Sequence, residues 1–460
     1  MKRITVLLSL FSCIAIMAQP VVKDGGINAE LLKEIQTAYK ATPQDKAVKN
    51  ALAGTSIATL AINSENAAMI DTHFSDRVKS KGVTDQKSSG RCWLFTGLNV
   101  LRAQMMEQHD LPEFTLSQGY VFFYDQLEKA NLFLQSVIDT RDKPFDDREV
   151  DWLFSNPISD GGTFTGVGNL VTKYGCVPSD AFVETFSANS TAQMRQILSL
   201  KLREDGLRLR EAKQKDASGM KVQMLGEIYR ILVLCLGEPP AEFEWTRCNK
   251  AGEIVETRTY TPVQFYREYL GNDLENGYVM LMNDPCREYY KVYEIQYDRH
   301  CYEGQNWKYL NVPNDEFKQI AIASIKAGKA MYISCDVSKF LSRSKGTLDI
   351  DNMDYASLFG VEFGMDKRER ILTHASGSSH AMTLVAVDLK EGKPMKWMVE
   401  NSWGRDYGYK GHLIMTDEWF ENYMFRIVAE KQFVPEKLLR KLDQKPILLP
   451  AWDPMFSQDE

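Results

Sequence analysis

The sequence has no excess of basic residues. Its 460 residues include 55 Lys and Arg against 62 Asp and Glu, which gives a formal net charge of −7. A net acidic chain has no general attraction for phosphate backbones, so we expect no nucleic-acid partner. The 44% hydrophobic and 25% charged residues are typical of a globular protein, long enough for two or three domains or for one enlarged enzyme fold.

Long hydrophobic runs are also scarce. The clearest one, residues 4–18, follows two basic residues and ends at the small Ala18, a pattern typical of a secretory signal peptide. It is shorter than the roughly 20 apolar residues of a membrane-spanning helix, so we expect no stable membrane span. The sequence therefore predicts an exported protein, periplasmic or secreted, that loses residues 1–18. The alternative is a lipoprotein attached through Cys13, in Leu10-Phe11-Ser12-Cys13.

Cysteines are few and scattered. Removal of the predicted signal peptide leaves seven of the eight, so at least one is unpaired unless it bonds to another chain. The chain has no CxxC pair and no HExxH motif, and we expect neither a metal nor another cofactor. The nearest approach to a metal cluster is Cys286 with His300-Cys301, which we interpret as unrelated core or loop positions. A free thiol in an exported protein is a liability unless its reactivity is used.

One cysteine has the context of a reactive thiol. Ser88-Ser89-Gly90 leads to Cys92, and apolar residues follow at helical spacing, which predicts a helix starting at the cysteine: Leu94, Leu98, Leu101 and Met105. The positive end of a helix dipole favours a thiolate. Gln86 is placed so that its side-chain amide could join the Cys92 N–H as an oxyanion donor. On these residues alone, Cys92 is either an activated nucleophile or a buried structural cysteine.

A thiolate nucleophile needs a base, and the base needs an orienting acceptor. His380 opens the apolar run 381–387, a predicted strand, and so stands at a strand edge. The next predicted strand ends in Asn401, which is followed by Ser402-Trp403-Gly404. An asparagine can hold a histidine tautomer by hydrogen bonding. Four other histidines have no partner motif and are interpreted as surface or core residues: His73, His109, His300 and His412.

The order Gln, Cys, His, Asn-Ser-Trp-Gly resembles that of the papain-like cysteine peptidases. Asp160-Gly161-Gly162 followed by Tyr174-Gly175 resembles the glycine pair that lines the papain cleft and hydrogen-bonds the substrate main chain. Within that clan the sequence is most similar to the bleomycin hydrolase and aminopeptidase C family. The similar motifs are Ser88-Ser89-Gly90-Arg91-Cys92-Trp93-Leu94-Phe95, Ser117-Gln118-Gly119-Tyr120-Val121-Phe122-Phe123, His380-Ala381-Met382-Thr383 and Leu449-Pro450-Ala451-Trp452-Asp453-Pro454-Met455.

The resemblance implies a fold and a set of roles. The fold would be α+β, a two-lobed papain-like peptidase with a helical lobe, an antiparallel β lobe and a large helical insertion. Cys92 would be the nucleophile, His380 the general base and acid, and Asn401 the residue that orients the histidine. Gln86 would donate to the oxyanion, and Trp403 would shield the histidine from water. Gly161 and Gly162 would bind the substrate main chain.

Local patterns and the resemblance together divide the chain into six expected parts. Asn28 predicts a capped helix that Thr42-Pro43 ends, and Thr115-Leu116-Ser117-Gln118 matches a capping box that opens a long helix. The predicted parts are a signal peptide (1–18), a helical lead-in (19–75), the papain-like helical lobe (76–190), an inserted, mainly helical region (191–330), the β lobe with His and Asn (331–435) and a C-terminal tail into the cleft (436–460).

The tail decides which peptidase activity is expected. Family members are aminopeptidases because their last residues lie in the cleft and offer a terminal carboxylate to the ammonium group of the substrate. The resemblance implies that Glu460 does the same here. This chain ends Phe456-Ser457-Gln458-Asp459-Glu460, bulkier and more acidic than the usual small apolar end. The alternatives are therefore an endopeptidase with an open cleft and a catalytically silent binding or assembly protein.

The resemblance also implies partners. We expect peptides as substrates. Family members assemble as hexamers with the active sites facing an inner channel, so we expect a homohexamer.

Overall fold

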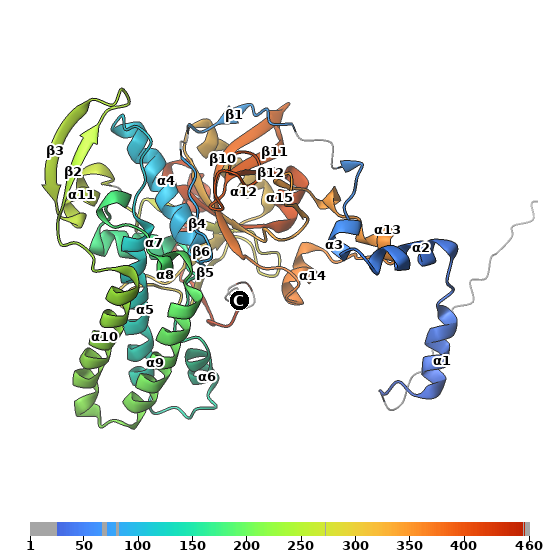
Figure 1. Ribbon diagram of the computed structural model, residues 1–460, viewed down its shortest axis with the longest axis horizontal. Coiled ribbons are helices and arrows are strands. Elements are labelled where there is room, and N and C mark those ends of the chain that lie inside the picture. Colours follow the sequence, from blue (N-terminus) through green and yellow to red (C-terminus); the bar gives the residue numbers. More distant parts are fainter. Residues whose placement is uncertain (1–24, 67–70, 80–81, 272, 454, 456–460) are drawn as a thin grey trace, which may run out of the picture. The chain divides into compact units, whose positions relative to one another are not determined.

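The structure is a computed structural model that describes residues 25–66, 71–79, 82–271, 273–453 and 455 (Figure 1). The predicted signal peptide, Cys13 and residues 456–460 lie outside the described residues. No helix within the described ranges is long and apolar enough to cross a membrane. Two compact units divide at Ala61 and Ile62, and the second contains Gln86, Cys92, His380 and Asn401.

In its described residues, 25–61, the first unit contains three helices, α1 (Ala29–Ala38), α2 (Pro43–Leu52) and α3 (Ile57–Leu60). The prediction of a cap at Asn28 is confirmed, because its side chain accepts the N–H of Leu31 at 2.9 Å. The prediction that Thr42-Pro43 ends this helix is wrong. Thr42 instead caps α2, where it forms a reciprocal capping box with Asp45, and Pro43 takes the first helical position, which needs no N–H donor.

The helical lobe is built around α4 (Cys92–Gln108), the helix predicted to start at Cys92. Its apolar stripe is buried, and α4 packs against α5 (Gln118–Asp139), α7 (Phe164–Tyr174) and the sheet. The long helices α9 (Ala192–Glu211) and α10 (Gln214–Leu236) lie beside α5 (Figure 1). The lobe also contains α6 (Arg148–Ser155), α8 (Phe186–Asn189), α11 (Pro262–Tyr269) and a hairpin of β2 (Phe243–Cys248) and β3 (Ile254–Tyr260).

The residue that caps α5 is not the first residue of the predicted capping box. The capping box was placed at Thr115, but α5 begins at Gln118 and its cap is Ser117. The Ser117 hydroxyl accepts the N–H of Tyr120 and donates to the carbonyl of Phe182 at 2.6 Å. The hydroxyl that caps α5 is thus also bonded to a distant part of the chain.

The second lobe is a sheet in the order β14-β5-β6-β4-β13-β7-β10-β11-β12-β9-β8, with β1 paired to β10. Most neighbours are antiparallel, as predicted, but three pairs are parallel: β4 with β6, β5 with β14 and β9 with β12. The strands are β1 (Asp76–Arg77), β4 (Tyr278–Met282), β5 (Val292–Ile295), β6 (Lys308–Asn311), β7 (Met331–Cys335), β8 (Leu341–Ser342), β9 (Thr347–Leu348), β10 (His380–Lys390), β11 (Lys393–Glu400), β12 (His412–Thr416), β13 (Met424–Glu430) and β14 (Ile447–Leu449).

Short helices connect and cover these strands. They are α12 (Asn314–Lys326), α13 (Tyr355–Phe359), α14 (Lys367–Leu372), α15 (Asp417–Tyr423) and α16 (Glu436–Leu439). Four 3-10 helices are also found in the described part of the chain: η2 (Ser179–Ala181), η3 (Ile350–Asn352), η4 (Lys431–Phe433) and η5 (Arg440–Asp443).

Residues 191–330 contain more sheet than the sequence suggested. Besides α9 to α12, this segment supplies β4, β5 and β6, three strands of the main sheet. β4 pairs with β13 near the end of the chain, and its residues are mostly buried. The apolar run of β4 was therefore a sheet strand whose partner is distant in sequence, which local periodicity does not reveal.

Candidate active site

Three elements bring Cys92, His380 and Asn401 to one place. Cys92 is the first residue of α4, His380 is the first residue of β10, and Asn401 directly follows β11. The strands β10 and β11 are antiparallel, so the start of one lies beside the end of the other. Since α4 packs against β10, the cysteine faces the same region. A cleft of about 480 Å³ is lined by Gln86 and Cys92 from one side and by His380 from the other.

The His380 imidazole is held in one tautomer. Its Nε2 lies 2.9 Å from Oδ1 of Asn401, and the main-chain N–H of Ser402 donates to the same oxygen at 2.8 Å. Because the N–H of Ser402 can only donate, the shared atom is the amide oxygen, and Nε2–H of His380 is the second donor. The lone pair of the ring is then on Nδ1, where it can accept a proton from a thiol.

Trp403 covers this histidine. The two ring centroids are 4.9 Å apart with the planes tilted by 32°, and Tyr407 packs edge-on against the indole. His380 is 7% exposed. Burial lowers the pKa of His380 to about 4, against the opposing effect of the hydrogen bond to Asn401. At neutral pH the imidazole is therefore an uncharged base.

Gln86 is fixed on three sides. Its N–H donates to the carbonyl of Ser402 at 2.8 Å, and its Oε1 accepts the hydroxyl of Ser402 at 2.6 Å. Its Nε2 donates one hydrogen to the carbonyl of Ser89 at 2.6 Å. A primary amide has two hydrogens, so the second is left for a ligand of the cleft. The two side-chain bonds give the amide a fixed direction, which an oxyanion donor requires, and the main-chain bond holds the residue itself.

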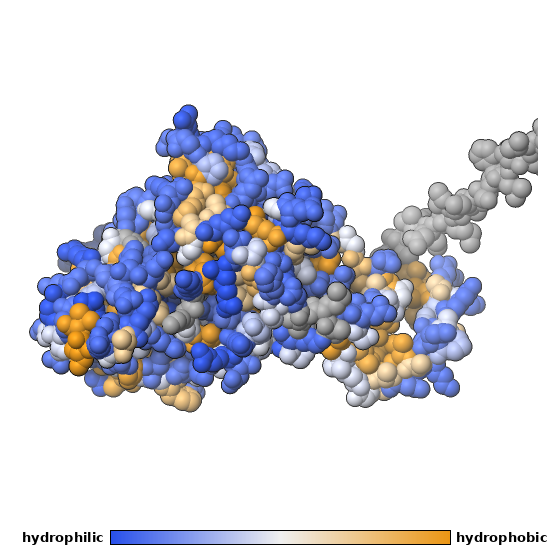
Figure 2. Space-filling view, turned by 90° about the horizontal axis from the view of Figure 1, so that it is seen from above, coloured by the Kyte–Doolittle hydropathy of each residue, from blue (hydrophilic) through white to orange (hydrophobic). Residues whose placement is uncertain are grey.

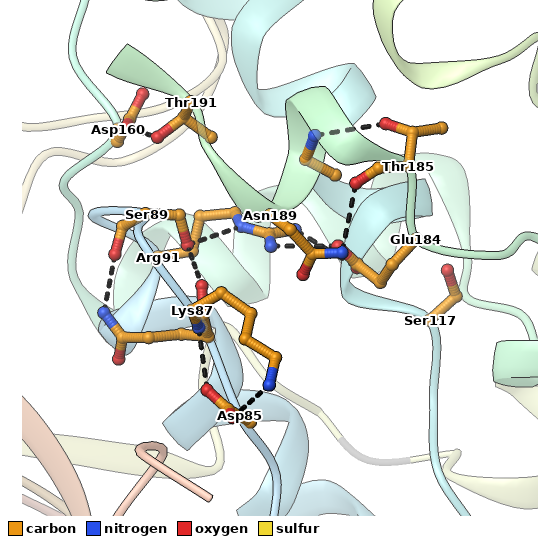
Figure 3. A network of polar contacts seen from close by, with 12 residues as sticks. Asp85, Lys87, Ser89, Arg91, Ser117, Asp160, Glu184, Thr185, Asn189 and Thr191 are labelled. Atoms are coloured by element: carbon orange, nitrogen blue, oxygen red, sulfur yellow. Dashed lines mark hydrogen bonds and ion pairs between the residues drawn. The ribbon is translucent and has the colours of Figure 1, made fainter.

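A buried arginine holds the loop before the cysteine (Figure 3). The guanidinium of Arg91 is buried, and Nη2 lies 2.9 Å from Oε2 of Glu184. Nε donates to the hydroxyl of Ser89 at 3.0 Å, and that hydroxyl donates to the carbonyl of Gln86 at 2.6 Å. The Gln86 loop and the start of α4 are thus joined through Arg91.

Gly161 and Gly162 line the same cleft. The indole N–H of Trp93 donates to the carbonyl of Asp160 at 2.7 Å, which ties the preceding residue to α4. A Cβ on Gly162 would lie 2.7 Å from Cδ2 of Trp93 and 2.4 Å from Cε1 of His300, whereas a Cβ on Gly161 would meet nothing within 4 Å. Gly162 is therefore glycine for lack of space, and Gly161 faces open space.

The end of the described chain is anchored at this cleft. Arg426, which lines the cleft, donates from Nη2 to the carbonyl of Met455 at 2.9 Å. Asp453 forms an ion pair with Arg287, and Met455 is buried. Glu460, which was predicted to meet the substrate, lies outside the described residues.

The remaining histidines and cysteines give no further triad. Of the histidines without a motif, His73 is exposed, His109 and His412 are half-buried, and His300 is buried beside Asp125. Within the described ranges, the seven cysteines form no disulfide with one another, and no group of three or more His, Cys, Asp or Glu could hold a metal ion.

Sequence reasoning missed three contributors to the site, namely Ser402, Arg426 and the His300–Asp125 pair. Ser402 lies inside the Asn-Ser-Trp-Gly motif, and that position was the signal that could have identified it. Asp125 is 175 positions from His300, so no local pattern joins them. Arg426 lies within a buried strand and carries no motif.

Comparison with known proteins places the chain in a family. The model of the Peptidase C1-like family matches residues 26–456. The chain belongs to this family. The peptidase is 37% identical to bleomycin hydrolase of Homo sapiens over 451 residues, which cover 94% of this chain and 99% of the relative. It is 35% identical to aminopeptidase C of Listeria monocytogenes over 432 residues, covering 93% and 98% of the two chains.

A solved structure supports the same assignment. The crystal structure of pepw from Lactobacillus rhamnosis matches the peptidase with a TM-score of 0.90 and 34% sequence identity, covering 94% of this chain and 99% of that chain. The predicted papain-like α+β fold and the predicted membership of the bleomycin hydrolase and aminopeptidase C group are confirmed.

Proposed function

We propose that this peptidase is a cysteine aminopeptidase, which removes N-terminal residues from peptides. The observation that carries the proposal is the meeting of Cys92 and His380 in one cleft, with Asn401 bonded to the histidine. The second support is the C-terminal segment, which is anchored at the same cleft by Arg426. Relatives named aminopeptidase C and bleomycin hydrolase cover nearly the whole chain.

The proposed reaction has two halves. The Cys92 thiol transfers its proton to Nδ1 of His380, and the sulfur attacks the carbonyl carbon of the scissile amide. The resulting oxyanion accepts hydrogen bonds from the Cys92 N–H and the second amide hydrogen of Gln86. His380 then gives its proton to the departing amine as the C–N bond breaks, which leaves a thioester.

Water completes the cycle. His380 takes a proton from water, whose oxygen attacks the thioester carbon. When the C–S bond breaks, the proton returns to the sulfur and the carboxylic acid leaves. The indole of Trp403 keeps the bond between His380 and Asn401 away from solvent throughout.

In this proposal, the C-terminal tail restricts each cleavage to one residue at the N-terminus of the substrate. Five residues follow Met455, enough to reach about 17 Å when extended. They carry Asp459, Glu460 and the terminal carboxylate. The cleft is lined by Arg195 and Arg299, so an acidic segment is compatible with it in charge. A terminal carboxylate in the cleft would attract the substrate ammonium and exclude longer N-terminal extensions.

The test compares two substrates and two chain lengths. We expect the full chain to hydrolyse aminoacyl fluorogenic amides and to reject their N-acetylated counterparts. A chain ending at Met455 should accept the acetylated amides and lose part of its preference for a free amine. Efficient cleavage of acetylated amides by the full chain would instead indicate an endopeptidase. Absence of cleavage together with slow alkylation of Cys92 would indicate a silent papain-fold protein.

Export and assembly complete the proposal. Residues 1–18 have the pattern of a signal peptide, and mass analysis of the protein from separated cell fractions tests their removal, with a lipid on Cys13 as the alternative result.

Apolar side chains reach the mostly hydrophilic surface (Figure 2), and those on α9 and α10 suit a subunit contact: Ile197, Leu200, Leu207, Val222 and Leu234. Light scattering of the purified protein tests the expected homohexamer.

A further inference from the structure

A buried His–Asp pair, separate from His380 and Asn401, lies beneath the glycine segment of the cleft. Nδ1 of His300, in the loop after β5, lies 2.5 Å from Oδ1 of Asp125 on α5, and the two residues are 2% and 0% exposed. Burial raises the pKa of Asp125, but Lys129 and His300 outweigh it and hold the pKa below its ordinary value. The carboxylate is therefore ionised, and Nδ1–H of His300 is the donor.

Lys129 connects this pair to the main chain of the cleft. It lies one turn after Asp125 on α5, and its Nζ donates to Oδ2 of Asp125 at 2.9 Å. The same ammonium donates to the carbonyls of Ser159 at 3.0 Å and Gly161 at 2.6 Å. All three hydrogens of the ammonium are thus used, two of them to fix residues 159–161.

The bond to Gly161 also sets the direction of the next N–H. A peptide unit is planar and trans, so the carbonyl of Gly161 and the N–H of Gly162 point in opposite directions. With the carbonyl held by Lys129, the N–H of Gly162 cannot turn freely. No acceptor for this N–H is found in the described part of the chain. It is a fixed donor at the wall of the cleft, available to a ligand.

His300 supports the same segment from behind. Its ring centroid lies 4.6 Å from that of Trp93. A Cβ on Gly166, at the start of α7, would lie 2.4 Å from Cδ2 of the imidazole, and a Cβ on Gly162 would lie 2.4 Å from Cε1. The imidazole thus fills the space that two glycines leave, and Asp125 fixes its ring plane.

We propose that Asp125, Lys129 and His300 are positioning residues that hold residues 159–162 in the conformation that binds the substrate main chain. They touch no reacting atom and act through Gly161 and Gly162. The inference rests on the proposed function only in taking the glycine pair as a substrate-binding element. It goes beyond that function in assigning a role to three charged or titratable residues outside the Cys–His–Asn triad.

The experiment compares two alkylating reagents on the full chain. Iodoacetamide reports the reactivity of the Cys92 thiol alone, whereas an aminoacyl chloromethyl ketone must also use the glycine segment. In Lys129→Met, which keeps the aliphatic stem but loses three donated bonds, we expect the chloromethyl ketone rate constant to fall about tenfold. The iodoacetamide rate constant should change less than twofold. Hydrolysis of aminoacyl amides should show the same loss mainly as a higher KM.

Matched variants separate positioning from general stability. Lys173→Met removes another paired lysine of the helical lobe, bonded to Glu128 and Glu303 outside the cleft, and should leave both rate constants unchanged. His300→Asn retains a donor in place of Nδ1–H and should recover part of the loss seen in His300→Ala. Equal loss with both reagents, or no loss with either in Lys129→Met and His300→Ala, would overturn the inference. Because alkylation does not need turnover, a wild-type chain that fails to hydrolyse amides would refute only the proposed function.

Discussion

Nε2 of His380 and Oδ1 of Asn401 lie 2.9 Å apart across the ends of two neighbouring strands, and Oδ1 also accepts the N–H of Ser402. The second donor identifies the amide oxygen and so fixes the imidazole tautomer. The pairing of β10 with β11 brings Asn401 to Nε2 of His380, and Nδ1 is therefore the ring nitrogen that can accept a proton.

Loss of the Asn401 amide should leave the nucleophile in place and disorder the base. We expect Asn401→Ala to lower kcat/KM for aminoacyl amides by about 10²-fold, the lower range for general acid–base assistance, because the imidazole remains but its tautomer is no longer fixed. Asn401→Asp keeps an oxygen acceptor and should retain more activity than Asn401→Ala. Steady-state kinetics with a circular-dichroism check of folding measures this, and full activity of Asn401→Ala would contradict the assigned role.

The acid limb of the pH profile should reflect the buried histidine. The pKa of His380 is lowered to about 4, so its imidazole gains a proton only as the pH falls through that value. A protonated imidazole beside a protonated thiol cannot accept the thiol proton, and kcat/KM should fall below about pH 4 while staying level near neutrality. A limb near pH 6.5, the ordinary value for histidine, would show that the site is more hydrated than the structure indicates.

The two glycines should differ sharply in tolerance. Gly162→Ala places a Cβ 2.4 Å from His300 and 2.7 Å from Trp93, so we expect a loss of about 1–3 kcal/mol in unfolding free energy and a higher KM. Gly161→Ala is the matched control, because its Cβ meets nothing within 4 Å. Urea unfolding and kinetics of both variants test this, and equal behaviour of the two would be inconsistent with the described packing.

The buried guanidinium before the nucleophile should contribute to stability. Arg91→Met leaves Glu184 without its ion-pair partner and leaves the Ser89 hydroxyl with only its bond to the carbonyl of Gln86. We expect the unfolding free energy to fall by about 1–3 kcal/mol, less than for a fully buried pair because Glu184 keeps some contact with water. The double variant with Glu184→Gln should recover part of this. Thermal unfolding measures the change, and a loss below the error of the measurement would exclude a structural role for the pair.

Much of the candidate site could be predicted because its residues lie in short sequence motifs. Cys92, His380 and Asn401 each stand at the start or end of an element, where glycine, small polar residues and apolar runs mark the boundary locally. The antiparallel pairing of β10 and β11 then places His380, at the start of one strand, beside Asn401, at the end of the other.

The rest depends on contacts between distant parts of the chain. The His300–Asp125 bond joins a loop of the sheet region to α5, and β4 pairs with β13 near the C-terminus. Ser117 and not Thr115 caps α5, and its hydroxyl donates to the carbonyl of Phe182, 65 positions further along the chain. Periodicity and capping patterns are local, so none of these choices could be made from them.

The most direct test of the central claim is amide hydrolysis by the full chain with and without the Cys92 sulfur. We predict that the wild-type protein hydrolyses free aminoacyl fluorogenic amides and that iodoacetamide labels one cysteine rapidly, identified as Cys92 by mass spectrometry. Cys92→Ala should fold normally, lose the rapid label and hydrolyse the amides no faster than background. Retained hydrolysis by Cys92→Ala would contradict the account.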